Sequence, residues 1–227
     1  MRLSWQQIPS TIVSDLLCQN SFDGVVLDTE HGCFNKETLY NCIQVIENNN
    51  KKSFVRLTEI NKAMIRYCLD ASASGLIFST IEEIEQLSKI EEYCLYPAQG
   101  GRRGLGLVKE NLWGKKDFVS RFPIIVAQIE TKRGAQMLPY FKNNSISYYM
   151  IGPYDLSASL GKPGDFESEE YCNIIKNINK IIPKERMAVH IPMNVEEELY
   201  KYVDYGMLAL GMDTISILER YYILENI

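Results

Sequence analysis

The chain has 227 residues, of which 46% are hydrophobic and 23% are charged, so it can bury one sizeable core and is typical of a globular protein. The formal net charge of −5, with lysine and arginine residues scattered among acidic ones, argues against a nucleic-acid partner. No apolar run is long enough to cross a bilayer, and the N-terminal residues lack the apolar stretch of a signal peptide, so we expect no membrane partner.

Short apolar, β-branched runs recur along the chain, and each is followed by a stretch with helical periodicity. The eight predicted strands span residues 3–8, 24–28, 53–57, 75–79, 124–130, 148–152, 187–191 and 207–211. The predicted helices span residues 10–20, 36–48, 61–72, 81–93, 117–122, 134–143, 168–182 and 195–205. This alternation is typical of a parallel α/β sheet, and eight strands favour its closure into a single-domain (β/α)8 TIM barrel over residues 1–227.

The boundaries of these elements carry suitable residues. Ser10, Asn35 and Asn61 can cap the helices that they precede, and Gly206 follows the last helix. Residues 96–107 (YPAQGGRRGLGL) predict a loop, because they are too polar and too rich in glycine for a buried element. An open doubly wound sheet would show the same alternation, but no GxGxxG motif follows the first strand, so we favour the barrel.

Polar side chains gather where the predicted strands end, and a packed barrel has no structural need for them, because unpaired buried charge is costly. Active sites of TIM barrels lie at this end of the strands. We therefore expect these side chains to converge on one site: Trp5, Gln7, Asp28, Glu30, His31, Arg56, Gln128, Glu130 and Asp155.

Glu130 and Asp155 are candidate metal ligands. Two carboxylates with the other coordination positions open suit Mg²⁺, Mn²⁺ or Co²⁺, and an all-oxygen set argues against zinc. The alternative is that each acid caps the helix that follows it. Their position among the other polar residues favours the metal site.

His31 and Arg56 are candidate catalytic groups. His31 follows the strand at 24–28, beside acidic residues, where an imidazole suits acid–base catalysis, and Arg56 could stabilise a developing oxyanion. A surface ion pair is the alternative for Arg56. His190 lies near the end of the seventh predicted strand, where it could either contact substrate or remain structural, and spacing alone gives Asp70 no function.

Seven segments carry a resemblance to a known family: FDGVVLDTEHG (22–32), FVRL (54–57), NKAMIRYCLDASASG (61–75), YPAQGGRRGLG (96–106), VAQIET (126–131), IGPYDLSASLG (151–161) and YGMLALGMDTISI (205–217). They resemble the HpcH/HpaI aldolases, the class II, metal-dependent pyruvate aldolases of the phosphoenolpyruvate/pyruvate-binding barrel superfamily. The resemblance covers nearly the whole chain, and the pair QIET and IGPYDLSASLG is highly specific.

The resemblance implies reversible cleavage of a 4-hydroxy-2-oxo acid, such as a 2-keto-3-deoxy sugar acid, into pyruvate and an aldehyde through a metal-stabilised enolate. It implies that His31 is the acid–base group with Asp70 as its partner, and that Arg56 holds the 2-oxo oxygen. The remaining roles that it implies are metal binding by Glu130 and Asp155, substrate binding by Gln128 and Trp5, and reception of the carboxylate by backbone N–H groups of the segment Pro153, Tyr154, Asp155 and Leu156.

Three departures from the family pattern concern specificity and assembly. About three residues are missing after the fourth predicted strand, the C-terminus is short, and His190 stands where the family is not associated with histidine. We therefore hypothesise that His190 reads the aldehyde portion of the substrate. The resemblance also implies a homo-oligomer, a hexamer or trimer, in which the tail at about 213–227 is exchanged between subunits; a simple covering helix is the alternative. The six cysteines show no CxxC spacing, and together with the lack of a signal peptide this predicts a cytoplasmic location.

Two other functions remain open from the sequence. One is a related carbon–carbon lyase that acts on a 2-oxo dicarboxylate or an acyl-CoA ester, although His31 and the absence of a basic surface speak against it. The other is a non-catalytic barrel that has lost turnover. The sequence leaves the aldehyde, the physiological direction and the native metal undetermined.

Overall fold

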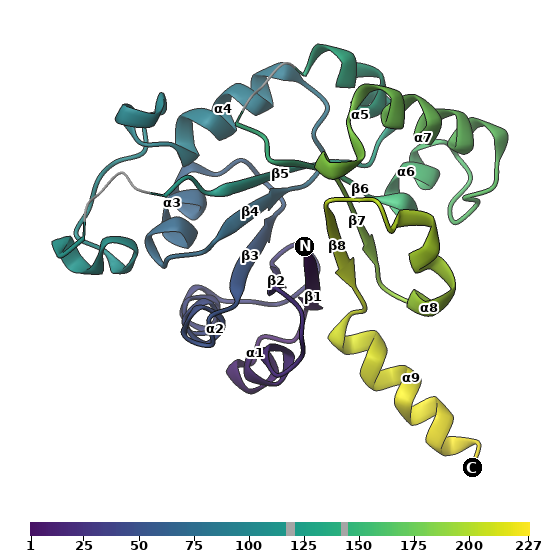
Figure 1. Ribbon diagram of the computed structural model, residues 1–227, viewed down its shortest axis with the longest axis horizontal. Helices are drawn as coiled ribbons and strands as arrows, with labels where there is room; N and C mark the ends of the chain where they lie inside the picture. The colour runs from purple at the N-terminus through teal and green to yellow at the C-terminus, as the bar shows by residue number, and fades with distance from the viewer. Residues whose placement is uncertain (117–120, 142–144) are drawn as a thin grey trace.

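The computed structural model describes residues 1–116, 121–141 and 145–227 and has eight parallel strands that close into a barrel in sequence order (Figure 1). The barrel confirms the predicted (β/α)8 fold and excludes the open doubly wound sheet. Its strands are β1 (Arg2–Gln6), β2 (Gly24–Asp28), β3 (Lys52–Leu57), β4 (Gly75–Phe78), β5 (Ile124–Ile129), β6 (Tyr148–Ile151), β7 (Met187–Ile191) and β8 (Met207–Leu210).

Helices surround this barrel, and five of them match the predicted ranges to within three residues. The helix predicted at 195–205 was wrong in its length, because only its first four residues are α-helical. The α-helices of the described residues are α1 (Thr11–Cys18), α2 (Lys36–Asn48), α3 (Lys62–Asp70), α4 (Ile84–Cys94), α5 (Lys132–Met137), α6 (Pro153–Ser159), α7 (Glu169–Ile181), α8 (Val195–Glu198) and α9 (Asp213–Glu225). Helix α6 is absent from the predicted helix ranges, although the sequence did indicate the start of a helix near Asp155. Of the helix predicted at 117–122, residues 117–120 lie outside the described residues, as do residues 142–144 near the end of the helix predicted at 134–143.

The helix starts show which capping predictions hold. Asn35 accepts a hydrogen bond from the backbone N–H of Thr38, and Asn61 caps α3 in the same way. The prediction for Ser10 was wrong in its chemistry: Ser10 occupies the N-cap position of α1, but its side chain makes no capping hydrogen bond. The side chains of Gln6 and Ser14 instead donate to the Ser10 carbonyl.

Alternation along the strands divides the apolar core into two clusters. The cluster inside the barrel takes every second residue of each strand: Leu3, Trp5, Val26, Phe54, Ile77, Val126, Met150, Ala188, Met207 and Ala209. The second and larger cluster lies between the strands and the helices; α2, for example, buries Leu39, Cys42, Ile43 and Ile46 at helical spacing. Burial of each large apolar side chain stabilises the fold by about 1.5–3 kcal/mol.

The inward-facing positions continue past the apolar cluster toward the carboxyl ends of the strands. Two residues beyond Val26, Phe54, Val126 and Ala188 come the polar residues Asp28, Arg56, Gln128 and His190. Because side chains alternate along a strand, these four face the mouth of the barrel. The fold thus places a polar layer on top of an apolar one.

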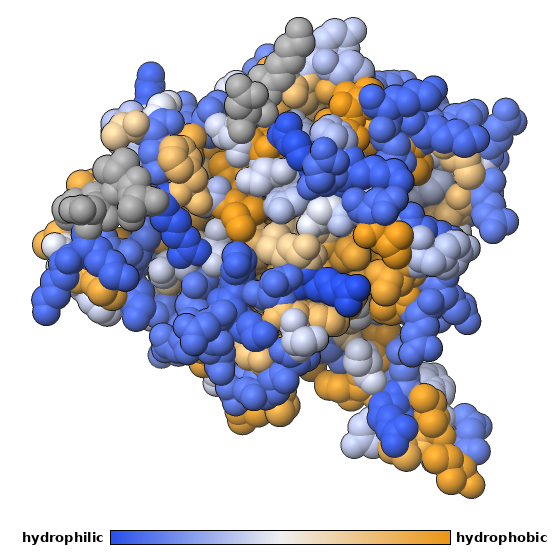
Figure 2. Space-filling model, in the orientation of Figure 1, coloured by the Kyte–Doolittle hydropathy of each residue, from blue (hydrophilic) through white to orange (hydrophobic). Residues whose placement is uncertain are grey.

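Helix α9 extends away from the barrel, and the C-terminus lies at its far end (Figure 1). Figure 2 shows hydrophobic residues on its surface. Ile217, Leu218 and Ile223, and the aromatic side chains of Tyr221 and Tyr222, are each about half or more exposed. Among the described residues, no helix combines the length and the apolar character that crossing a membrane requires.

Candidate active site

A cavity of about 160 Å³ opens at the carboxyl ends of the strands. Its walls bring together most of the residues that the sequence singled out, along with some that it did not: Trp5, Gln7, His31, Arg56, Gln128, Ile151, Gly152, Pro153, Tyr154, Asp155, His190, Pro192 and Met212. Glu130 is buried next to this cavity and accepts a hydrogen bond from Gln128, which lines the cavity. Asp70 is not among the residues that line the cavity.

Arg56 is held rigidly at the bottom of the cavity by Asp28. The Nε and Nη2 atoms of Arg56 donate to the two carboxylate oxygens of Asp28 at 2.8 and 2.6 Å. Burial alone would raise the pKa of Asp28, but hydrogen bonds from Arg56, Gln7 and Trp5 and the charge of Arg56 outweigh it and lower this pKa to about 2. Asp28 is therefore ionised at any pH at which an enzyme normally works.

Two further contacts fix the Arg56 guanidinium. Nη1 lies 2.8 Å from the carboxylate of Glu30, which also accepts a hydrogen bond from Ser79. The guanidinium carbon lies 4.9 Å from the centre of the Trp5 ring. The alternative of a surface ion pair is wrong, because the Arg56 side chain is only 8% exposed and its partner Asp28 is fully buried.

Glu130 is a buried carboxylate in an acidic environment. Its Oε1 accepts hydrogen bonds from the N–H and the hydroxyl of Thr80, both at 2.6 Å, and its Oε2 accepts one from Gln128. Burial raises the pKa of Glu130; the charges of Glu30 and Asp155 act in the same direction, and the Thr80 hydrogen bonds oppose them. A nearby cation would relieve this unfavourable accumulation of negative charge.

Neither metal candidate caps a helix, so the capping alternative is wrong for both. The N-cap of α5 is Thr131, whose hydroxyl accepts from the N–H of Gly134, and the N-cap of α6 is Gly152. Asp155 is exposed in the first turn of α6, and its charge acts on Glu130.

Two features leave room for a ligand beside Glu130. A Cβ atom at Gly152 would come within 2.8 Å of Glu130 Oε2, so only glycine keeps this space open. The Oε1 atom of Gln128 is buried and has no hydrogen-bond partner among the described residues. Buried polar atoms are rarely left unpaired, and this one is accounted for if a ligand or water binds there.

No group of three or more His, Cys, Asp or Glu side chains is arranged to hold a metal ion within the described parts of the chain. A metal site here would therefore rest on Glu130 and Asp155, with the remaining positions filled by water and substrate oxygens, as Mg²⁺ commonly binds.

His31 is exposed on the loop that follows β2. Its backbone N–H donates to Asp28, and the next residue packs closely: a Cβ at Gly32 would lie 2.3 Å from the Asp28 carbonyl oxygen. The loop is thus pinned to the end of β2, which holds the imidazole of His31 at the rim of the cavity.

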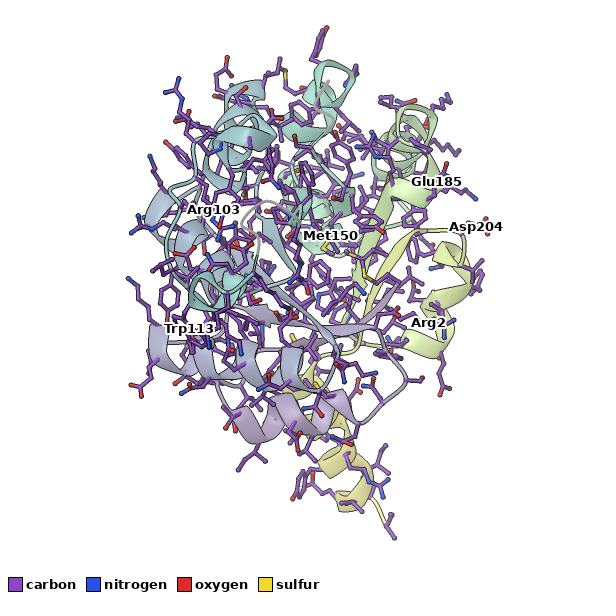
Figure 3. The ribbon with its side chains drawn as sticks, turned by 60° about the vertical axis from the view of Figure 1, so that its left-hand side comes forward. Arg2, Arg103, Trp113, Met150, Glu185 and Asp204 are labelled. Carbon is purple, nitrogen blue, oxygen red and sulfur yellow. The ribbon has the colours of Figure 1, made fainter. Side chains whose placement is uncertain are left out.

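Asp70 lies at the end of α3 in a separate ionic cluster. Its Oδ1 is 2.7 Å from Nη2 of Arg103, and the same nitrogen is 2.6 Å from Glu110. Arg103 belongs to the loop predicted at 96–107 but is buried, and in Figure 3 it lies well apart from Met150 of the barrel interior. Within the described residues, no contact joins Asp70 to His31, so the partnership implied by the family resemblance stays a prediction.

The segment predicted to receive a carboxylate opens α6. Pro153 has no N–H, and the N–H of Leu156 is already bonded to the Gly152 carbonyl. Tyr154 and Asp155 therefore supply the two first-turn N–H groups that lack an acceptor in the helix. This narrows the predicted anion contact to two donors.

Sequence reasoning missed Thr80, and it placed His190 near the end of the seventh strand without deciding between contact with substrate and a structural role. Thr80 adopts a left-handed backbone conformation (φ 52°), in which its backbone N–H and its hydroxyl both donate to Glu130. No sequence pattern predicts this conformation for a threonine. The position of His190 could have been inferred from strand alternation. It lies two residues after Ala188, which faces the barrel interior, so the side chain of His190 faces the same way.

Comparison with known proteins gives consistent results. A family model described as HpcH/HpaI aldolase/citrate lyase matches residues 9–219. A 2-keto-3-deoxy-L-rhamnonate aldolase from Salmonella gallinarum and a 4-hydroxy-2-oxo-heptane-1,7-dioate aldolase from Klebsiella pneumoniae are each 27% identical over 95% of this chain and 84% of their own length. A crystal structure of an HpcH/HpaI aldolase/citrate lyase family protein from Burkholderia cenocepacia superposes with a TM-score of 0.87 at 19% identity, covering 99% of this chain and 92% of the other, which shows a shared fold.

Proposed function

Because this chain belongs to the HpcH/HpaI aldolase/citrate lyase family, we propose that it is a divalent-metal-dependent carbon–carbon lyase that reversibly cleaves a 4-hydroxy-2-oxo acid into pyruvate and an aldehyde. The observation that carries the proposal is the convergence of Arg56, Gln128, Asp155 and His31 on one cavity, with Glu130 directly beside it. The names of the two relatives describe aldolases that act on 2-oxo acids, which supports this substrate class.

The residues present fit a divalent cation. Glu130 and Asp155 would hold it. Burial raises the pKa of Glu130, the charges of Glu30 and Asp155 add to this rise, and a cation would compensate for the negative charges. Which of Mg²⁺, Mn²⁺ or Co²⁺ binds is open, because all three accept carboxylate oxygens. The chemistry that such an ion supplies is Lewis-acid stabilisation of negative charge on the 2-oxo oxygen.

The other residues would bind and orient the oxo acid. Arg56 would donate to the 2-oxo oxygen, where negative charge develops, and its contacts with Asp28 and Glu30 keep it from moving as that charge appears. The N–H groups of Tyr154 and Asp155 would receive the carboxylate, and Trp5 would line the cavity beside the pyruvate methyl group.

His31 would act as the acid–base group. In cleavage it would take the proton of the 4-hydroxyl group while the C3–C4 bond breaks and the aldehyde leaves. The electron pair of that bond would stay on the other portion as the enolate of pyruvate, which gains a proton at C3 to become pyruvate; condensation is the reverse. Asp70 would be its partner, as the family resemblance implies, and the ion pair with Arg103 engages only Oδ1 of Asp70, leaving Oδ2 for this contact.

Exchange of the pyruvate methyl protons tests the proposal without requiring the aldehyde to be known. The purified protein is incubated with pyruvate and Mg²⁺, Mn²⁺ or Co²⁺ in deuterated water. After the incubation the ion is removed with chelator, and the remaining methyl proton signal of pyruvate is measured by NMR. We expect that the signal is lost only in the presence of an ion, because proton loss from the methyl group requires a stabilised enolate.

A sample treated with chelator before pyruvate is added serves as the control. If none of the three ions supports exchange, the proposed function is wrong, and a different oxo-acid substrate or a non-catalytic barrel takes its place.

We also propose that α9 mediates assembly of a homo-oligomer, a trimer or hexamer, by exchange between subunits. The helix projects from the barrel and exposes a large apolar surface, which is typical of an interface rather than of a free monomer surface (Figures 1 and 2). Its start is anchored within the chain, because Asp213 accepts hydrogen bonds from the N–H groups of Gln7 and Ile8.

Removal of the tail tests this assembly. A chain that ends at Thr214 keeps the Asp213 anchor and loses the apolar face, so we expect a smaller assembly in sedimentation velocity. A chain that ends at Glu225, which retains all of α9, is the control and should sediment as the full chain does. An unchanged assembly in the shorter chain would make α9 a simple covering helix.

A further inference from the structure

His190 lies in the polar layer of the barrel mouth and has no part in the mechanism described above. Its ring stacks on Trp5, with centroids 3.9 Å apart and planes inclined by 9°. The residue is half-buried and forms part of the cavity wall together with Trp5 and Arg56. The ring is thus held in a fixed orientation at the edge of the space that the substrate would occupy.

The hydrogen bond of His190 determines its tautomer. Nε2 lies 3.1 Å from the carbonyl oxygen of Gly211, and a carbonyl can only accept, so Nε2 carries the proton. Burial lowers the pKa of His190 to about 4, and the positive charge of Arg56 acts in the same direction. The ring is therefore neutral at physiological pH, and Nδ1 carries a lone pair.

Nδ1 of His190 is an acceptor without an assigned donor. The N–H groups of the neighbouring side chains of Trp5 and Gln7 both donate to Asp28 instead. Within the described residues, the hydrogen bond with Gly211 is the only one that the His190 ring makes. A neutral acceptor in a cavity wall suits a ligand that brings its own donor.

The chemistry of the substrate indicates which part of it this acceptor would meet. Pyruvate offers a carboxylate, a carbonyl oxygen and a methyl group, none of which donates a conventional hydrogen bond. The groups proposed to bind it, Arg56 and the first N–H groups of α6, are donors, as its oxygens require. An acceptor has a partner only in a hydroxyl group, and the hydroxyl groups belong to the other half of the substrate.

We propose that His190 is a specificity-determining residue whose Nδ1 accepts a hydrogen bond from a hydroxyl group of the aldehyde portion, so that the enzyme prefers hydroxyaldehydes to their deoxy analogues. The inference rests on the proposed aldolase function and adds the class of aldehyde. A site built to bond a hydroxyl discriminates against the analogue that lacks it, because the buried partner then stays unpaired.

The test compares glycolaldehyde with acetaldehyde, which differ by one hydroxyl group, as acceptors of pyruvate. We expect the wild-type kcat/KM to favour glycolaldehyde by about tenfold or more. In His190→Phe, which keeps a ring against Trp5 but has no acceptor, the ratio should fall by about tenfold. His190→Asn, which places an amide oxygen close to the position of Nδ1, should retain most of the preference.

The ratio between two aldehydes cancels any loss of activity that is common to both, and the pyruvate exchange reaction reports on the proposed function separately. Wild-type protein without exchange would remove the aldolase function itself. Exchange with no wild-type preference for glycolaldehyde, or with an unchanged ratio in His190→Phe, would overturn this inference alone. If His190→Phe fails to fold, two results still test the inference: it is overturned if the wild type shows no preference for glycolaldehyde, or if His190→Asn loses the preference as completely as a residue without an acceptor would.

Discussion

Glu130→Gln is expected to reduce metal-dependent exchange of the pyruvate methyl protons by about three orders of magnitude or more, because loss of a Lewis acid removes several kcal/mol of charge stabilisation. The fold should tolerate the change. The side-chain oxygen of the glutamine can still accept from Thr80. Its amide N–H can donate to Oε1 of Gln128, which is otherwise unpaired, if the Gln128 side-chain amide flips by 180°.

Stability separates loss of the metal site from misfolding in this variant. Because burial and the charges of Glu30 and Asp155 raise the pKa of Glu130, its ionised form is unfavourable near neutral pH, and a neutral glutamine should keep or raise the melting temperature without metal. The rise in melting temperature on adding metal should disappear, since binding no longer stabilises the folded state.

Glu47→Gln is the matched control. Glu47 accepts hydrogen bonds from Ser53 and Ser74 at the amino ends of β3 and β4, the opposite end of the barrel. This variant should retain both exchange and the metal-dependent rise in melting temperature. If Glu130→Gln also retains both, Glu130 is not a metal ligand.

The fold was predictable because its signal is local and repeated. The strands are recognisable in the sequence as short apolar runs separated by segments with helical periodicity. Strands β2 and β7 begin and end at the predicted residues. Their closure into a barrel followed from the count of strands rather than from any one of them. Periodicity alone did not reveal helix α6, because its seven residues are too few to show a period, although the residues around Asp155 did indicate the start of a helix.

Part of the candidate site was predictable because strand position decides the direction of a side chain, whereas His31 and Asp155 were singled out in the segments that follow two strands. Arg56 and Gln128 are inward-facing residues at the ends of their strands, so their position in the predicted strands was enough to identify them as site residues. The contact of Asp70 with Arg103 was not foreseeable, because it joins α3 to a loop 33 residues later in the chain. Pairings of this kind depend on the path of an irregular loop, which periodicity does not encode.

The effect of Arg56→Lys follows from the shape of the guanidinium group. Arginine satisfies both oxygens of Asp28 and reaches Glu30 through separate nitrogens, while its position over Trp5 fixes the plane. Lysine keeps the charge but offers one flexible ammonium group, which cannot make this set of contacts and also remain placed at the 2-oxo oxygen. We expect kcat for pyruvate exchange to fall by about 10²–10³-fold, the usual effect of losing one preorganised oxyanion donor.

Arg186→Lys is the control for Arg56→Lys, because Arg186 is a partly buried arginine beside the amino end of β7 that lies over the Tyr149 ring and donates to the Ile146 carbonyl. The Arg186→Lys variant should exchange the pyruvate methyl protons at a rate close to that of the wild type. Near-normal exchange in Arg56→Lys would mean that a positive charge suffices at this position and that the clamp formed by Asp28 and Glu30 serves only the stability of the barrel. A large loss of kcat with a native melting temperature would instead tie the geometry of Arg56 to the chemistry, since the charge at this position is the same in both proteins.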